Sequence, residues 1–144
     1  MSESALSTVP RAESPAGDVV EVTLPASSAY LSVLRTATAG LAARLDFTLD
    51  EIEDLRIAVD EACAMLLPQA APDAELVCRF VLEDDAIEVT VRAPTTRGVQ
   101  PERETFSWTV LTALAGEVDA GIDEGLTVWI SLHKRRGLPT GTGS

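Results

Sequence analysis

Residues 46–67 read DFTLDEIEDLRIAVDEACAMLL, and this stretch decides the fold. Thr48 is a favourable N-cap residue, and Glu51 three positions later completes a capping box. Apolar side chains then recur at helical spacing on one face, at Ile52, Leu55, Val59, Cys63 and Leu66. Pro68 ends the pattern, because its ring clashes with the preceding turn. The stretch therefore predicts one long amphipathic helix with an acidic outer face.

The rest of the pattern predicts strands and two further helices around this one. Strands are expected over residues 19–24, 75–82, 87–92 and 126–133, helices over 28–45 and 106–114, and loops over 93–104 and 116–125. The short helix is expected to bury Phe106, Val110 and Leu114, with Trp108 to the side. This order predicts an α+β fold, a two-layer sandwich with helices on one face of a mostly antiparallel mixed sheet.

Composition divides the 144 residues into one domain and two tails. Residues 1–17, rich in Ser, Ala, Pro and acids, are expected to be disordered, residues 18–136 to form the domain, and residues 137–144 to be flexible. No apolar run approaches the roughly 20 residues that span a bilayer, and no signal peptide is visible. Cys63 and Cys78 lie in apolar patterns and are expected to be reduced, buried thiols. Together these features predict a cytoplasmic protein without a membrane segment.

The net charge of −12 restricts the partners. Phosphates would be repelled, so direct nucleic-acid binding is not expected, whereas a basic protein partner is compatible with this charge. His133 is the single histidine, and no Cys or carboxylate lies at a metal-ligand spacing from it. The sequence therefore predicts no metal site. High solubility is the alternative explanation of the charge.

Two segments carry a family resemblance. With the order of elements, DLRIAVDEACAMLL at residues 54–67 and FSWTVLTALAGEV at residues 106–118 resemble the RsbW-type anti-sigma factors, especially the actinobacterial members called UsfX. The resemblance implies the GHKL (Bergerat) ATPase fold and a homodimer. It also implies sequestration of a stress or sporulation-type sigma factor, with release by an anti-anti-sigma antagonist. Arg35 matches a family position that contacts the sigma factor.

The same resemblance implies a nucleotide site that has lost key groups. Glu61 matches the family glutamate that polarises the attacking hydroxyl. Met65 stands where the family has a magnesium-binding asparagine, and Ala93 where it has an adenine-binding aspartate. Magnesium prefers oxygen ligands, and Gly98 is the single glycine of the 93–104 loop. We therefore expect no ATP or Mg²⁺ cofactor, and Glu61 is either a catalytic carboxylate or a relic on a solvated helix face.

Two other functions stay open from the sequence. One is an ATP-dependent serine kinase that phosphorylates the anti-anti-sigma factor, with Glu61 as the catalytic carboxylate. The other is a protein-interaction module that has no link to transcription. Nucleotide titration separates the kinase from a pure binding protein, and sigma-factor capture separates both from the third possibility.

Overall fold

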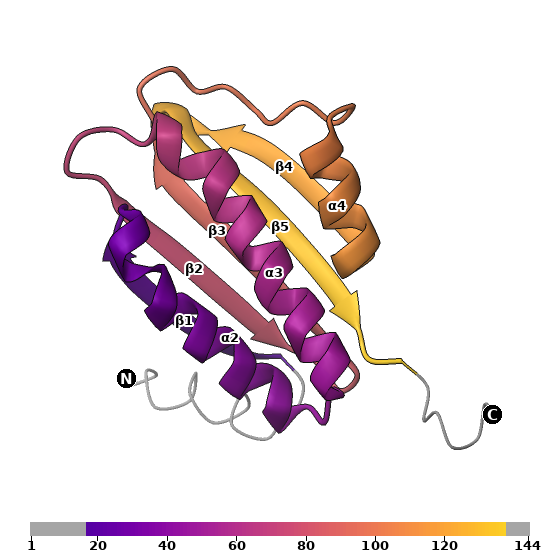
Figure 1. Ribbon diagram of the computed structural model, residues 1–144. Helices are drawn as coiled ribbons and strands as arrows, with labels where there is room; N and C mark the ends of the chain where they lie inside the picture. Colours follow the sequence, from indigo (N-terminus) through magenta and orange to yellow (C-terminus); the bar gives the residue numbers. More distant parts are fainter. Residues whose placement is uncertain (1–16, 138–144) are drawn as a thin grey trace, which may run out of the picture.

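The computed structural model describes residues 17–137, which form a five-stranded sheet with helices on one face (Figure 1). The elements are β1 (Asp18–Pro25), α2 (Leu31–Arg44), α3 (Leu49–Leu66), β2 (Glu75–Leu82), β3 (Ala86–Pro94), α4 (Phe106–Ala115), β4 (Glu117–Asp123) and β5 (Thr127–Arg135). Short 3-10 helices occupy Ser28–Tyr30, Leu67–Gln69 and Glu124–Leu126. The sheet order is β1-β2-β3-β5-β4, and all neighbouring strands are antiparallel. The predicted two-layer α+β fold is confirmed.

Helix α3 begins where its capping signal predicts. The Thr48 hydroxyl accepts a hydrogen bond from the Glu51 N–H at 3.1 Å, and the Glu51 carboxylate accepts one from the Thr48 N–H at 2.8 Å. Of the predicted apolar stripe, Leu55, Val59, Cys63 and Leu66 are buried, and Ile52 is partly buried. The helix lies across the middle of the sheet, between α2 and α4 (Figure 1). It therefore borders both candidate sites, the one that includes Arg35 and the nucleotide site that would include Glu61 and Met65.

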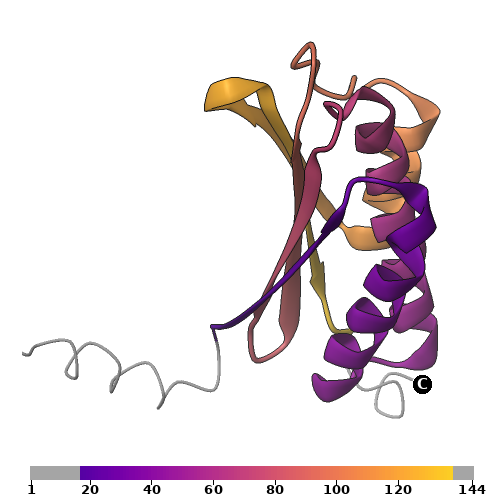
Figure 2. The same cartoon turned by 90° about the vertical axis from the view of Figure 1, so that its left-hand side faces the viewer.

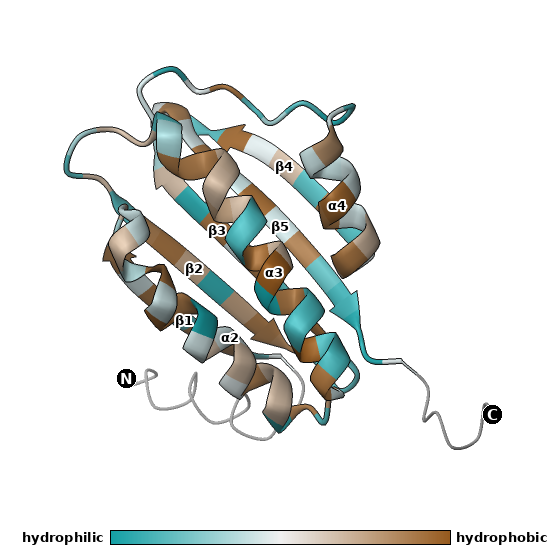
Figure 3. Ribbon diagram, in the orientation of Figure 1, coloured by the Kyte–Doolittle hydropathy of each residue, from teal (hydrophilic) through white to brown (hydrophobic). Residues whose placement is uncertain are grey.

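The core fills the space between the sheet and the three helices (Figure 2). Buried positions alternate with more exposed ones along β2, β3 and β5, so that one side of each strand faces the helices (Figure 3). The largest fully buried side chains on these strands are Leu76, Phe80, Ile87, Val89, Val91, Ile130 and Leu132. Burial of each contributes about 1.5–3 kcal/mol of transfer free energy. In the described part of the chain, no helix covers the other face of the sheet.

Strand β4 corrects the prediction of a loop over residues 116–125. It pairs with β5 from Glu117↔His133 to Asp123↔Thr127. Its sequence, EVDAGID, contains three acids and a glycine, which are poor strand formers. The strand forms because its backbone groups complete the β5 ladder and its inward residues Val118 and Ala120 reach the core. This tertiary pairing has no local signal in the sequence.

Helix α4 buries a different face from the one predicted. Trp108, Leu111 and Ala115 face the core, whereas Phe106 is 83% exposed. A ten-residue helix that is apolar almost all round offers two competing stripes, and the pattern alone does not choose between them. The structure buries the larger tryptophan ring, over which the guanidinium of Arg103 lies at 4.7 Å from the ring centroid.

The end of β5 is tied to the start of α3. Arg136 donates a hydrogen bond to the Leu45 carbonyl at 2.7 Å, and the Gly137 N–H donates one to the Glu51 carboxylate at 2.6 Å. The predicted tails, residues 1–17 and 137–144, lie outside the described residues apart from Gly17 and Gly137. Between those two glycines, every helix is too short or too polar to cross a bilayer.

Candidate functional site

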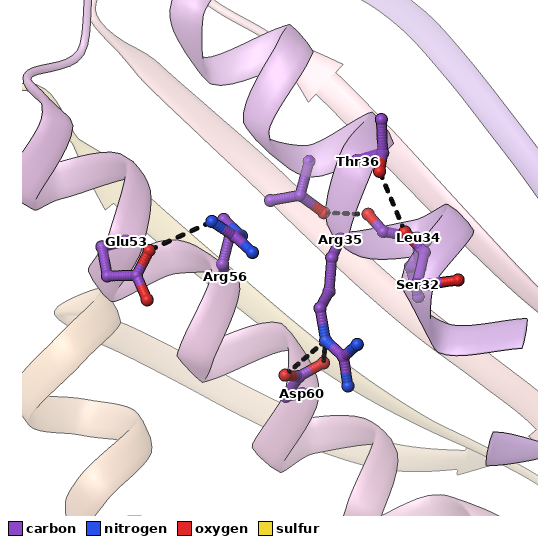
Figure 4. Close-up of polar contacts among 8 residues, drawn as sticks. Ser32, Leu34, Arg35, Thr36, Glu53, Arg56 and Asp60 are labelled. Atoms are coloured by element: carbon purple, nitrogen blue, oxygen red, sulfur yellow. Dashed lines mark hydrogen bonds and ion pairs between the residues drawn. The ribbon is translucent and has the colours of Figure 1, made fainter. Parts of the chain in front are cut away.

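Arg35 on α2 is held in place by Asp60 on α3 (Figure 4). Its Nε donates hydrogen bonds to both carboxylate oxygens of Asp60, at 2.8 and 3.0 Å. The Arg35 and Asp60 side chains are 40% and 36% exposed. The two terminal nitrogens of Arg35 make no hydrogen bond with any residue between 17 and 137, and Figure 4 shows them turned away from Asp60. The pair therefore presents a fixed guanidinium at the outer surface where α2 meets α3.

The neighbouring residues of α2 explain this position. Leu34 and Thr38 are buried, and the Thr38 hydroxyl donates to the Leu34 carbonyl at 2.8 Å. Arg35 follows Leu34 by one residue, so it lies about 100° further around the helix, at the border of the buried stripe. The aliphatic stem can pack on the helix pair while the charged end stays in solvent.

Asp60 is a site residue that sequence reasoning missed. In the sequence Asp60 is only one of the acids on the outer face of the predicted helix. The structure instead pairs it with Arg35, 25 residues away on another helix. Because the contact is set by the packing of α2 on α3, no local spacing could have revealed it. Glu61 lies about 100° around α3 from Asp60, so the two carboxylates do not act on one group.

The two cysteines are buried in the core and are unreactive. Cys63 and Cys78 are buried and free, as the sequence predicts. Burial raises the pKa of the Cys63 thiol to about 12, and the nearby negative charge of Asp60 adds to the effect. Burial also raises the pKa of Cys78 well above its ordinary value. Neither thiol is therefore ionised at neutral pH, so neither is a nucleophile.

The positions that the family resemblance assigns to nucleotide chemistry lie on α3 and β3. Glu61 is half-buried and makes no hydrogen bond or ion pair with another described residue. Met65, one turn later, packs against the core. Ala93 is 1% exposed and pairs in register with Val128. The two replaced positions therefore present a thioether and a methyl group, which supply no oxygen for Mg²⁺ and no acceptor for an adenine amine.

The loop after β3 also lacks a free phosphate cradle. Thr95 is buried, and its hydroxyl donates to the Leu126 carbonyl at 2.6 Å and accepts from the Gly98 N–H at 2.8 Å. Gln69 holds Val99 by two hydrogen bonds, one from its amide to the Val99 carbonyl at 2.7 Å and one from the Val99 N–H at 3.1 Å. Phosphate cradles need unpaired backbone N–H groups. The residues present therefore do not fit an ATP–Mg²⁺ complex.

His133 lies on the uncovered face of the sheet, as expected for the outer side of the last strand. Its side chain is 19% exposed, with Nε2 3.3 Å from a Glu83 oxygen and Nδ1 3.4 Å from a Glu117 oxygen. Across residues 17–137 there is no group of three or more His, Cys, Asp or Glu side chains that could hold a metal ion. His133 thus belongs to a surface charge cluster.

The described chain is a two-layer α+β domain, and its fold matches that of a solved protein. The domain superposes on the crystal structure of the RsbU and RsbW domains of a Mycobacterium tuberculosis protein with a TM-score of 0.66 at 17% identity, covering 85% of this chain and 33% of that one. At this identity the likeness shows the fold. No family model matches the chain.

The chain is also similar in sequence to curated proteins. The chain is 41% identical over 103 residues to the anti-sigma-F factor RsbW of Mycobacterium tuberculosis, which covers 69% of this chain and 59% of the relative. It is 39% identical over 77 residues to the serine-protein kinase RsbW of Bacillus subtilis, which covers 51% of this chain and 48% of the relative. The chain thus spans about half the length of these curated relatives. It is a homologue of the RsbW proteins, as its motifs predicted.

Proposed function

We propose that this protein is an anti-sigma factor, which binds an alternative sigma factor and is released by an anti-anti-sigma antagonist. The observation that carries the proposal is the Arg35–Asp60 pair, in which a guanidinium is fixed at the surface with two donors free. One relative is itself named an anti-sigma-F factor.

The chemistry of Arg35 suits this role. A guanidinium with two free terminal nitrogens can bind a partner carboxylate through two parallel hydrogen bonds. Because Asp60 already restrains the side chain, less conformational entropy is lost when the partner binds. The net charge of −12 speeds encounter with a basic sigma-factor surface. We place this interaction in the cytoplasm, where sigma factors meet RNA polymerase.

We propose that the protein acts by sequestration and does not catalyse phosphoryl transfer efficiently. The Bacillus relative is named a serine-protein kinase, and Glu61 is present at the matching position. The kinase function is therefore the second candidate. Met65, Ala93 and the hydrogen-bonded 95–99 loop argue against it, because phosphoryl transfer depends on positioning both metal and phosphates.

Two measurements test this proposal. The purified chain should form a stable complex with one alternative sigma factor of its own cell and inhibit transcription from that factor's promoter without added ATP. Failure to bind any sigma factor, together with capture of an unrelated protein, would favour an interaction module outside transcription. Calorimetry with ATP and Mg²⁺ should show no binding, whereas micromolar, magnesium-dependent affinity would establish the kinase candidate. Gain of ATP binding should require both Met65→Asn and Ala93→Asp.

We further propose that the protein is a homodimer that pairs through β1. Among residues 17–137 this strand lies at an edge of the sheet and pairs only with β2, and Val19 on it is 47% exposed. An open strand edge with exposed apolar residues favours pairing with another chain. Light scattering should give a mass about twice 15.3 kDa. A monomer mass at tens of micromolar protein would refute the dimer.

A further inference from the structure

The face of the sheet that the helices leave uncovered is not a simple solvated surface. In a sheet with one solvated face, outward positions are usually polar. Here the outward positions of β2 include Val77 and Val81, and β5 carries Trp129 on the same side. Figure 2 shows this side of the sheet free of helices. A tryptophan and two valines therefore lie partly exposed where no element of the described chain packs on them.

Trp129 is held flat against the sheet. One row of neighbours crosses all five strands, formed by Thr23, Val77, Arg92, Trp129 and Gly121. A Cβ atom at Gly121 would lie 2.5 Å from the Trp129 ring, so glycine is what lets the ring lie over β4. The ring therefore forms a fixed apolar platform beside Arg92.

A depression of about 590 Å³ opens next to this platform. It is lined by Glu75, Val77, Arg92, Ala93, Pro94, Asp123, Glu124 and Thr127. Among the described residues Arg92 is the one cation of this lining, and Asp123 pairs with it at 3.0 Å. Glu75 and Glu124 have no ion-pair partner between residues 17 and 137. Three carboxylates against one guanidinium give the depression a net charge of −2.

We propose that this uncovered face is a docking surface for a basic polypeptide segment of a partner protein. A lysine or arginine of that segment enters the depression and pairs with Glu75 and Glu124. An apolar side chain next to it packs on Val77 and the Trp129 platform. Charge complementarity selects this occupant, because the carboxylates of the depression outnumber its cation. The inference uses no residue of the Arg35 side, so it stands independently of the sigma-factor proposal.

A second copy of the chain is the wrong occupant for this face. Two-fold pairing would bring Glu75 and Glu124 of one protomer toward the same carboxylates of the other. The like charges would repel, and the depression has no spare cation to offset them, since Arg92 is already paired with Asp123. A basic segment can instead form ion pairs with the carboxylates and pack an apolar side chain on the Trp129 platform.

Nuclear magnetic resonance on the full chain tests the proposal directly. A ¹⁵N-labelled sample is titrated at low salt with the synthetic peptide acetyl-Arg-Val-Arg-Val-Arg-amide, and acetyl-Glu-Val-Glu-Val-Glu-amide serves as the control probe. The basic peptide should cause saturable shifts in the outward positions of β2, β3 and β5 and in the Trp129 indole N–H. The acidic peptide should cause none. Shifts centred on the helices, or no saturable shift, would overturn the proposal.

A charge-matched pair of variants separates this site from general electrostatics. Glu75→Gln with Glu124→Gln should weaken peptide binding about three- to tenfold, the size expected for two exposed ion pairs. Glu102→Gln with Glu104→Gln removes the same charge from the exposed loop before α4 and should leave the affinity unchanged. Equal weakening in both double variants would overturn the proposal. So would concentration-dependent broadening of the same sheet amides without peptide, because that result would identify a second copy as the occupant.

Discussion

Replacement of Arg35 by alanine should separate partner binding from folding. Within the fold, Arg35 and Asp60 form an ion pair at 2.8 Å whose side chains are 40% and 36% exposed. Such solvent-exposed pairs contribute about 0.2–1 kcal/mol, since water screens the charges. Arg35→Ala should therefore lower the free energy of unfolding by no more than about 1 kcal/mol.

The effect on the proposed complex should be larger. There the same guanidinium is desolvated against a sigma-factor carboxylate, and truncating one member of such a pair costs about 2–5 kcal/mol. At about 1.4 kcal/mol per decade, sigma affinity should fall at least roughly thirtyfold. Asp60→Asn removes only the group that orients Arg35. Ordering one long side chain costs about 0.5–1.5 kcal/mol. Asp60→Asn should therefore lower the sigma affinity about two- to tenfold.

Calorimetry of sigma binding and urea unfolding of the same samples measure both quantities. Arg56→Ala is the matched control, because Arg56 is also 40% exposed and pairs with Glu53 at 3.1 Å on α3. It should leave sigma affinity unchanged. The double variant of Arg35→Ala and Asp60→Asn should lose no more sigma affinity than Arg35→Ala alone, because Asp60 acts through Arg35.

Three results would refute this reasoning. Wild-type sigma affinity in a folded Arg35→Ala protein would remove Arg35 from the interface. Equal losses in Arg35→Ala and Arg56→Ala would show that total charge, and not a specific contact, governs affinity. A loss of several kcal/mol in unfolding free energy would show that the Arg35 stem is part of the core.

Further predictions concern the fold. Glu51→Gln should lower the free energy of unfolding by about 1 kcal/mol at neutral pH in urea titrations. Although burial favours the neutral acid, backbone N–H groups keep the pKa of Glu51 below its ordinary 4.5. The Glu51 carboxylate therefore stabilises the fold fully above pH 4.5, and this stabilisation is lost as the pH falls through its lowered pKa. The unfolding free energies of the variant and the wild type should then converge in acid. Gly121→Ala should destabilise the protein by about 1–3 kcal/mol and shift Trp129 fluorescence, because the new methyl group displaces the ring. Cys63 and Cys78 should react with thiol reagents at pH 8 only as fast as the protein unfolds; faster labelling would contradict their burial.

The sequence predicted the elements whose signals are local. The capping box of Thr48 and Glu51 and the stripe that follows them specify α3 within a few residues, and strict alternation specifies β5. The prediction of a loop over residues 116–125 was wrong, because residues of β4 are poor strand formers. They form a strand only through pairing with β5. The prediction of which face of α4 is buried was wrong, because two apolar stripes compete on this short helix.

The candidate site divides in the same way. Arg35, Glu61, Met65 and Ala93 could be singled out from the sequence because a family resemblance assigns their positions. The role of those residues stays a prediction. The contact of Asp60 with Arg35 and the hydrogen-bonded loop of residues 95–99 could not be predicted, since both join segments that are distant in the chain.

The geometry of α3 explains how partner binding can be separated from nucleotide chemistry. Asp60 faces α2, where it holds Arg35, whereas Glu61 and Met65 lie about 100° and about 140° further around α3. The side chains at these two positions therefore leave the Arg35–Asp60 pair between α2 and α3 in place. Under the proposed function, α3 contributes to partner binding through one flank and needs no metal ligand on another, because its flanks contact different neighbours.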